Sequence, residues 1–350
     1  MLNIDYNFLE RLVHRFALGF TFITKASFDF EETLCGSIED YTDEKHLFIS
    51  GLARSGTTVL MNNILDSGKY KSLTYLNMPF VLMPNGWKKL NVLTSRNFGK
   101  KERVHGDGIL VGPDSPEAFE EVFWRVFCGH DYIFKDRLRL QTINNDNIDR
   151  FRKFVNHVLK SRENKEQSRY LSKNNNNVLR FTGLLKTFPS SFIIATFREP
   201  LQQAISLLNQ HKKFSSIHNE NNFTLRYMNW LGHFEFGQNH KPFYFGDDKS
   251  YFRLNSYSTY DINYWLLIWK NYYTYLINNL TPNVILFCFE KYCNNPYDIL
   301  SNLFIMIDID CQIKPVEKFN PKVLTANDID YNILIECDLI YKQLIKKSVL

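Results

Sequence analysis

Residues 51–58, Gly-Leu-Ala-Arg-Ser-Gly-Thr-Thr, place two glycines, an arginine and three hydroxyl side chains directly after the apolar run 47–50. Against the phosphate-binding pattern G-x-x-x-x-G-K-[ST], both glycines and the final threonine are present, but Thr57 stands where the lysine belongs. A turn that leads from a strand into a helix offers unpaired N–H groups and the positive end of the helix dipole to an anion. The guanidinium of Arg54 matches phosphate or sulfate oxygens in geometry and charge. We therefore expect a phosphate-like group to bind here, held by Arg54, Ser55, Gly56, Thr57 and Thr58.

A second anion site is predicted after the apolar run 192–197, where the chain reads Arg198-Glu-Pro. Arg198 stands at the carboxyl end of that run, the edge at which ligands bind in α/β sheets. Ser206 follows eight residues later, two turns into a predicted helix, on a face that can turn toward the same ligand. Two separate anion sites indicate a ligand with two separate anionic groups.

Together these residues resemble the sulfotransferases that use 3′-phosphoadenosine 5′-phosphosulfate (PAPS), in particular their carbohydrate and tyrosylprotein branch. The similarity includes RSGTT (54–58), YLSKNNNNVLRFTGLLKTFPSSFIIATFREP (170–200) and VILFCFEKYCNNPYDILSNLF (284–304). SLTYLNMPFVLMP (72–84) and HGDG (105–108) are similar to bacterial sulfotransferase-like proteins. The resemblance implies that residues 54–58 bind the 5′-phosphosulfate end of PAPS and that Arg198 and Ser206 bind the 3′-phosphate.

The resemblance also implies a reaction, the transfer of a sulfuryl group to a hydroxyl, with Arg54 and Lys173 as catalytic cations and no metal. Lys173 occupies the place of a lysine in tyrosylprotein sulfotransferase-like enzymes, whereas their glutamate after the first helix has no counterpart in Leu73-Thr-Tyr-Leu-Asn-Met. His105 is the first candidate for the missing base, because an imidazole titrates near neutral pH. Asp107 is the second candidate, and the others are Glu117, Glu120 and Glu121.

The acceptor is expected to be a hydroxyl-bearing molecule, with a carbohydrate or glycan favoured by the basic and aromatic character of the predicted pocket. Trp87, Trp230, Trp265 and Trp269 can stack on sugars, although most are expected in the core. Two other functions stay open. One is a kinase-like nucleotide-binding enzyme, since the run 284–289 is followed directly by the acidic residue Glu290. The other is a catalytically degenerate module that binds nucleotide or glycan without turnover.

The elements that must position these residues form an alternating pattern. Apolar runs at 47–50, 192–197 and 284–289 are each followed by a loop and a helical pattern, at 57–65, 201–211 and 296–307. Short apolar runs that alternate with helices are typical of a buried parallel sheet. We therefore predict an α/β, P-loop-like three-layer fold with a central, mainly parallel sheet.

Helical insertions are predicted within one sulfotransferase-like domain that spans 1–350, with an N-terminal helical extension at 1–45. The insertions, at 70–170 and 212–275, are expected to form the acceptor pocket. Within the first of them, 115–127 reads as a helix with Ser115 as its cap and Pro116 at its first position. Its apolar residues recur at helical spacing, which leaves Glu117, Glu120 and Glu121 off the buried stripe.

Composition supports a folded protein that does not bind nucleic acid. Of the 350 residues, 44% are hydrophobic, and the net charge of +5 lacks the dense basic stripe of a nucleic-acid binder. The six cysteines lack metal-ligand spacing and are expected to be buried thiols in the cytoplasm. The N-terminal stretch 16–24 is too short to span a bilayer and is expected to be an amphipathic helix packed on the body. A weak peripheral membrane contact through Phe16, Phe20 and Phe22 is the alternative.

Overall fold

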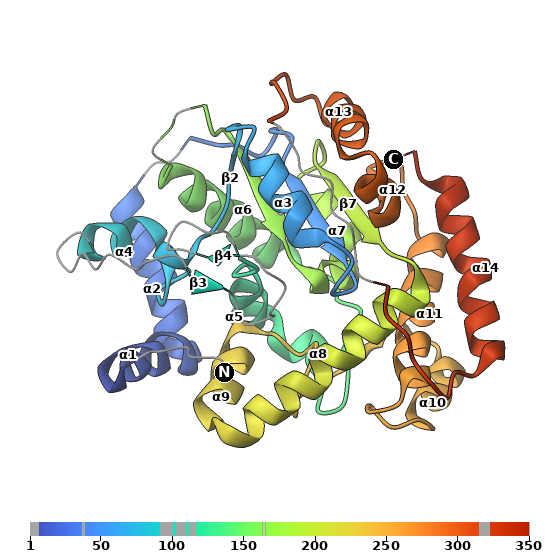
Figure 1. Cartoon of the computed structure of the whole chain (residues 1–350). Coiled ribbons are helices and arrows are strands. Elements are labelled where there is room, and N and C mark those ends of the chain that lie inside the picture. The colour runs from blue at the N-terminus through green and yellow to red at the C-terminus, as the bar shows by residue number, and fades with distance from the viewer. Residues whose placement is uncertain are drawn as a thin grey trace.

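The centre of the molecule is a five-stranded sheet in the order β2-β6-β1-β7-β9, and each pair of neighbouring strands is parallel (Figure 1). The computed structural model describes residues 7–36, 39–91, 101–102, 110–111, 117–162, 164, 166–314 and 323–349. The three predicted strands are confirmed, with β1, β7 and β9 at the expected positions. The strands of the sheet are β1 (Leu47–Gly51), β2 (Tyr70–Lys71), β6 (Arg169–Lys173), β7 (Phe192–Phe197) and β9 (Val284–Cys288).

Helices cover both faces of the sheet, which confirms the three-layer fold. Alternate residues of a strand point to opposite faces, so Leu47 and Ile49 of β1 pack in one apolar cluster and Phe48 packs in the other. The first cluster includes side chains of α3 (Thr57–Leu65), α12 (Phe289–Asn294) and α13 (Pro296–Met306). The second includes side chains of α6 (Asn145–Lys160), α8 (Pro200–Glu220) and α11 (Ile262–Asn278).

The remaining elements surround this core, and asparagine or aspartate caps several of the helices. Asn221, Asp261 and Asp330 each accept a hydrogen bond from a first-turn N–H group of the helix that follows. Two short pairs of strands lie outside the main sheet, one antiparallel (β3 with β4) and one parallel (β5 with β8). The elements not yet given are η1 (Tyr75–Asn77), α4 (Pro84–Asn91), β3 (Lys101–Glu102), β4 (Leu110–Val111), α5 (Glu121–Tyr132), β5 (Leu138–Arg139), η3 (Asn175–Arg180), α7 (Phe181–Thr187), α9 (Asn222–Leu231), β8 (Phe243–Tyr244), α10 (Asp248–Asn255) and α14 (Tyr331–Lys347).

The N-terminal segment forms two helices rather than the single helix predicted across 16–24. α1 (Phe8–Gly19) ends and α2 (Thr21–Cys35) begins at Phe20, whose backbone is extended. Both helices pack on the body through buried residues such as Leu18 and Phe28. Phe16, Phe20 and Phe22 stay 51%, 51% and 77% exposed. Within the described part of the chain, no helix combines the length and the apolar character that crossing a membrane requires.

The prediction for 115–127 was wrong at its start and in the placement of two glutamates. α5 begins at Glu121, after a turn at 118–120, while Ser115 and Pro116 lie outside the described residues. Glu120 and Glu121 are almost fully buried instead of lying off the buried stripe. Charged side chains are buried only when other groups compensate them, and here the compensating groups come from distant segments that the local pattern could not reveal.

Aromatic and cysteine side chains contribute mainly to the core. Trp265 and Trp269 are buried, whereas Trp87 and Trp230 are partly exposed. All six cysteines are free thiols, and five of them are buried, with Cys311 the partly exposed one.

Candidate active site

The loop between β1 and α3 places its backbone at the carboxyl edge of the sheet, next to the end of β7. Gly56 caps α3 with a φ of 87°, and no side chain caps this helix start. A Cβ atom at Gly56 would lie 2.4 Å from Cδ2 of Phe289, so only glycine fits. The first N–H groups of α3 therefore face the edge of the sheet without an intrahelical acceptor.

Two buried side chains hold this loop in place. The hydroxyl of Ser55 donates to the Leu52 carbonyl at 2.7 Å and lies 2.6 Å from Oγ1 of Thr196. The amide of Gln203 on α8 donates to the Leu52 and Ala53 carbonyls at 3.0 and 2.9 Å. The hydroxyl of Ser55 thus stabilises the loop. An anion would therefore be bound by the backbone N–H of Ser55 and not by its side chain.

Arg54 joins the two predicted anion sites. Its Nε donates to Oγ of Ser206 on α8 at 3.1 Å, across 152 residues of sequence. Its φ of 72° is uncommon for a residue other than glycine, and such backbone strain is concentrated at functional sites. Arg198, at the end of β7, approaches the Arg54 carbonyl with Nη1 at 3.5 Å. The structure thus brings Arg54, Arg198 and Ser206 together, as the sequence predicted for one ligand with two anionic ends.

The environment of Arg198 suits an anionic ligand. Its guanidinium lies 5.1 Å from the centre of the Phe289 ring, and its Nε is buried with no hydrogen-bond acceptor among the described residues. Burial lowers the pKa of Arg198, the attraction of Glu290 opposes that shift, and the neighbouring charge of Arg54 adds to it. The positive charges of two adjacent guanidiniums repel each other, and an anion bound between them offsets this electrostatic repulsion.

Glu290 takes part in the structure of the site through two hydrogen bonds. Its carboxylate accepts from the Glu199 N–H at 3.0 Å and from the Tyr341 hydroxyl at 3.1 Å. Glu199 in turn caps α8 through the N–H groups of Leu201 and Gln202. Glu290 therefore fixes the turn that carries Arg198. No group of three or more histidine, cysteine or acidic side chains suited to a metal occurs among the residues with described positions.

Lys173 stands at the end of β6, beside β1, and is largely buried. Its Nζ lies 3.3 Å from Oε1 of Glu117, and the two side chains keep 10% and 14% of their surface exposed. The next residue, Asn174, donates its backbone N–H to the Ile49 carbonyl at 2.9 Å. Lys173 is thus a positioned, paired cation at the same edge of the sheet as Arg54 and Arg198.

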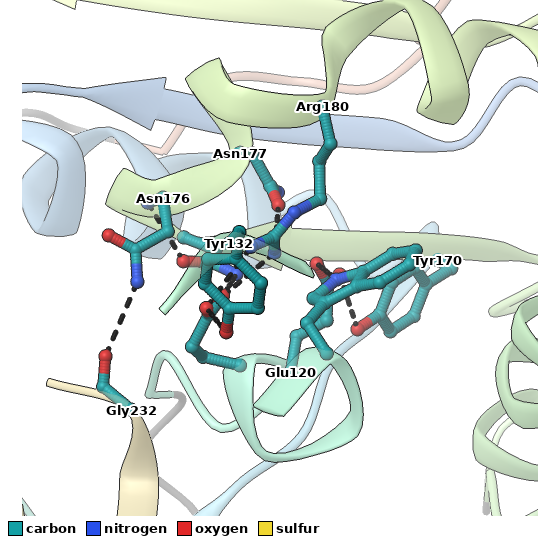
Figure 2. A network of polar contacts seen from close by, with 10 residues as sticks. Glu120, Tyr132, Tyr170, Asn176, Asn177, Arg180 and Gly232 are labelled. Carbon is teal, nitrogen blue, oxygen red and sulfur yellow. Dashed lines mark hydrogen bonds and ion pairs between the residues drawn. The ribbon is translucent and has the colours of Figure 1, made fainter. Parts of the chain in front are cut away.

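A buried polar network supports the segment that follows Lys173 (Figure 2). Both carboxylate oxygens of Glu121 accept from the guanidinium of Arg180, at 2.8 and 3.1 Å, and Asn174 donates to the same carboxylate at 2.7 Å. Glu120 accepts from Nε1 of Trp124 at 2.9 Å and from the hydroxyl of Tyr170 at 3.1 Å. These bonds explain why both glutamates are buried, and they make neither of them a group that an acceptor can reach.

Of the five residues predicted as candidate bases, three are described by the structure, and these lie in two different surroundings. His105 and Asp107 lie outside the described residues, so both stay predictions. Glu117 lies beside Lys173, and Glu120 and Glu121 belong to the buried network. Sequence reasoning also missed Gln203, His233 and Glu235. Only the stretch RYMNWLGHFEFG, in an insertion assigned to the acceptor pocket, pointed toward the last two, and no sequence signal marked Gln203.

Comparisons with known proteins agree with this geometry. A family model described as "Sulfotransferase family" matches residues 46–240. Sulfotransferase STF9 from Mycobacterium avium superposes with a TM-score of 0.50 at 14% identity, over 96% of this chain and 84% of that one. Sulfotransferase STF1 from Mycobacterium tuberculosis H37Rv gives a TM-score of 0.43 at 10% identity, over 85% and 76% of the two chains. No curated protein matches the chain in sequence. At this level of identity, the first superposition shows the fold alone.

Proposed function

Because the chain belongs to the sulfotransferase family, we propose that it transfers the sulfuryl group of PAPS to a hydroxyl group of an acceptor, and that this acceptor is a carbohydrate. The observation that supports the proposal most strongly is the contact between Arg54 and Ser206 at 3.1 Å, with Arg198 beside them. Two motifs far apart in sequence form one cationic site, as a nucleotide with phosphates at both ends requires.

The described residues fit such a nucleotide. The N-terminus of α3, without a side-chain cap, suits the 5′-phosphosulfate end together with Arg54, Thr57 and Thr58. Arg198 and Ser206 suit the 3′-phosphate, and the buried Nε of Arg198, which has no acceptor in the described part of the chain, supports a ligand contact there. PAPS supplies the activated sulfuryl group, and every other contribution comes from side chains and backbone groups of this chain.

Catalysis by these residues is electrostatic. Group transfer of this kind is accelerated when fixed positive groups neutralise charge on the transferred group and on the leaving oxygen. Arg54 and the α3 N-terminus lie on one side of the site, and Lys173 reaches its edge from the neighbouring strand β6. We assign Lys173 to the leaving oxygen. Its ion pair with Glu117 restrains the flexible side chain before substrate binds.

A carbohydrate acceptor is favoured over an apolar one by the side chains around Lys173. Glu117, His233 and Glu235 supply hydrogen-bonding groups, and all three are partly open to solvent. Purified protein supplied with radiolabelled PAPS should label glycans in preference to simple phenols. Labelling of phenols without any labelling of glycans would overturn the assignment of the acceptor and leave sulfuryl transfer intact.

Calorimetric titration with 3′,5′-adenosine bisphosphate, beside ATP with magnesium, tests the nucleotide site. Charge-assisted hydrogen bonds contribute roughly 1.5–3 kcal/mol each, so Arg54→Ala and Arg198→Ala should each weaken bisphosphate binding about ten- to a hundredfold. Arg226 is an exposed arginine on α9, and Arg226→Ala is the matched control that should leave the affinity unchanged.

Each rival function predicts a different result. Binding of ATP with magnesium but not of bisphosphate would replace the sulfotransferase assignment with a kinase-like enzyme. Tight bisphosphate binding without any consumption of PAPS would identify a module that has lost its activity.

The exposed phenylalanines of α1 and α2 support a weak contact with an anionic membrane surface, made by a protein that works in the cytoplasm. Phe16, Phe20 and Phe22 are accompanied by the exposed cations Arg15 and Lys25, and aromatic side chains beside cations are typical of helices that lie on bilayers. Sedimentation with phosphatidylserine vesicles should fall when the three phenylalanines are changed to serine. Equal sedimentation of both proteins would exclude this contact.

A further inference from the structure

His233 and Glu235 form a pair of side chains beside Lys173 that the predicted mechanism does not use. Both follow α9, and Nδ1 of His233 lies 3.5 Å from Oε2 of Glu235. Asn175, two residues after Lys173, donates to the other carboxylate oxygen of Glu235 at 3.1 Å. Glu235 is thus held from two sides and fixes one nitrogen of the His233 ring.

The second ring nitrogen of His233 is left for another molecule. Among the described residues, no hydrogen bond to His233 Nε2 accompanies the contact at Nδ1, and the side chain keeps 19% of its surface exposed. A histidine that a carboxylate orients through Nδ1 can accept a proton at Nε2, as in many hydrolases and transferases. The ring therefore has the two features of a positioned base, an orienting partner and a partly exposed side chain.

The charges around the ring come from three segments. Glu235 lies on the loop that follows α9, Glu117 lies before α5, and Lys173 ends β6. Burial lowers the pKa of His233, but the charge of Glu235 and the hydrogen bond to it outweigh burial. Glu117 adds to this rise and Lys173 opposes it, so the pKa of His233 is raised overall from its ordinary value. An imidazole in this position is a stronger base than a free histidine, which suits removal of a hydroxyl proton.

The buried network of Figure 2 ties His233 to the segment after Lys173. Nδ2 of Asn176 donates to the Gly232 carbonyl at 3.3 Å (Figure 2). Gly232 has a φ of 77°, and a Cβ atom there would lie 2.5 Å from Cγ of Glu121. The close packing of Gly232 on Glu121 fixes the start of the His233 loop relative to the network that also holds Asn174.

The loop between β1 and α3 lies near Glu235. A cavity of about 20 Å³ is lined by Leu52 and Ala53 of that loop and by Asn176 and Glu235, among others. This volume is enough for about one water molecule, so only a short distance separates Glu235 from the residue before Arg54. Glu235, a residue of the insertion, therefore lies close to the loop that carries Arg54.

We infer that His233, oriented by Glu235, is the base that removes the proton from the acceptor hydroxyl. The inference rests on the proposed sulfotransferase function and names a group that sequence reasoning had sought at His105. As the acceptor oxygen forms its bond to sulfur, its proton passes to Nε2 of His233. The bond from sulfur to the phosphate oxygen breaks, and its electron pair stays on that oxygen, beside Lys173. Atoms and charge balance without an oxidant, a reductant or a metal.

Consumption of PAPS with water as the acceptor hydroxyl tests the inference without knowledge of the natural acceptor. His233→Gln should slow this hydrolysis by about 10²–10⁴-fold while calorimetric affinity for 3′,5′-adenosine bisphosphate stays unchanged. His130→Gln, at an 80% exposed histidine side chain, is the control that should retain full turnover. His105→Gln and Glu117→Gln are measured in parallel, and thermal unfolding shows whether each variant is folded.

The possible outcomes distinguish an error in the assignment of His233 from an error in the proposed function. Near-normal hydrolysis by His233→Gln, or a large loss in His105→Gln or Glu117→Gln alone, would overturn the assignment of His233 and keep the sulfotransferase. Loss of bisphosphate affinity in His233→Gln would also overturn it, because a base does not hold the nucleotide. If the wild-type protein binds bisphosphate in calorimetry but does not hydrolyse PAPS, both the assignment of the base and the proposed function would be overturned.

The pH dependence of hydrolysis distinguishes a base from a residue that only supports the fold. His233 must be neutral to accept the proton, so the rate should fall on the acid side as pH drops through its pKa, which is raised from the ordinary value of a histidine. Glu235→Gln removes the charge that raises this pKa, so the acid limb should move to lower pH. An acid limb at the same pH in both proteins would contradict the role of Glu235.

Discussion

Gly56 has two separate constraints, a positive φ and a close neighbour. Its φ is 87°, and a Cβ atom would lie 2.4 Å from the Phe289 ring. Phe289 also lies under the guanidinium of Arg198, so the ring cannot shift without disturbing a residue that we propose to bind the nucleotide. Gly56→Ala should therefore destabilise the protein by about 1–3 kcal/mol and reduce bisphosphate affinity more than tenfold.

Gly68→Ala is the matched control for Gly56→Ala. Gly68 has a similar φ of 73°, but a Cβ atom there would meet no other atom within 4 Å, so this variant isolates the backbone strain. It should lose stability, measured by urea unfolding, and keep its affinity for bisphosphate. Equal affinities in the two alanine variants would contradict the role of the Phe289 contact.

Arg180 shows what burial of a charge requires. Its guanidinium is fully buried, binds Glu121 and lies over the rings of Trp124 and Tyr132. Burial alone would lower its pKa, but the charge of Glu121 raises the pKa overall. Arg180→Met would leave the Glu121 carboxylate buried without its cation, so the free energy of unfolding should fall by about 3–5 kcal/mol.

A second variant distinguishes the effect of the unpaired Glu121 charge on stability from the effect of the lost Arg180 packing. Arg180→Met combined with Glu121→Gln removes both charges and should recover part of the lost stability in urea unfolding. A double variant that is less stable than Arg180→Met alone would show that hydrogen bonding, and not the unpaired charge, dominates.

Helix α8 supports the proposed phosphate-binding loop, residues 52–56 between β1 and α3, through Gln203. Its amide donates to two loop carbonyls, while its Oε1 accepts from Nε1 of Trp269 at 3.0 Å and from the Tyr273 hydroxyl at 3.3 Å. The residue joins α8, α11 and the loop. Gln203→Ala leaves buried polar groups unpaired, at roughly 1–3 kcal/mol each, and should weaken bisphosphate binding at least tenfold by calorimetry.

Gln202 on the same helix is the matched control. Its amide exchanges hydrogen bonds with the backbone of Leu324 at 3.0 and 2.7 Å, away from the phosphate-binding loop. Gln202→Ala should lower the thermal midpoint and leave bisphosphate affinity unchanged. If both variants kept full affinity, Gln203 would not be the residue that holds the loop.

At the scale of the whole molecule, buried histidines make the fold sensitive to acid. Nδ1 of His46 accepts the Tyr170 N–H at 3.0 Å, and Nδ1 of His211 accepts the Gly237 N–H at 3.3 Å. Protonation of either nitrogen would break its bond. Burial lowers the pKa of both rings to about 4.

The direction of the effect follows from proton binding. Between pH 6.5 and about 4 the unfolded chain binds protons that the folded protein excludes, so stability is full above pH 6.5 and is lost as pH falls toward 4. The urea midpoint should therefore drop between pH 7.5 and pH 5. His130→Gln, at an exposed site, should leave that drop unchanged, and a midpoint independent of pH would contradict the assignment.

From the sequence alone we predicted three of the five strands of the sheet, β1, β7 and β9, and the two motifs proposed to bind anions, whereas β2 and β6 were not predicted. These features depend on local signals, because apolar runs, glycines and a helix start are written in consecutive residues. Arg54, Arg198 and Ser206 were predicted to act on one ligand, since parallel strands end at the same edge of a sheet. Their adjacency in the structure follows from the neighbouring places of β1 and β7.

The burial of charged side chains, and their position at the edge of the site, depend on contacts between segments that are far apart in the sequence. The helix pattern around 115–127 indicated exposed glutamates, yet Glu120 and Glu121 are buried because Arg180, Tyr170 and Asn174 come from later segments. His233 and Glu235 likewise lie about 60 residues beyond Lys173 and reach it through the packing of the insertion. Contacts at such separations depend on the folded arrangement of the whole chain, and no local pattern encodes them.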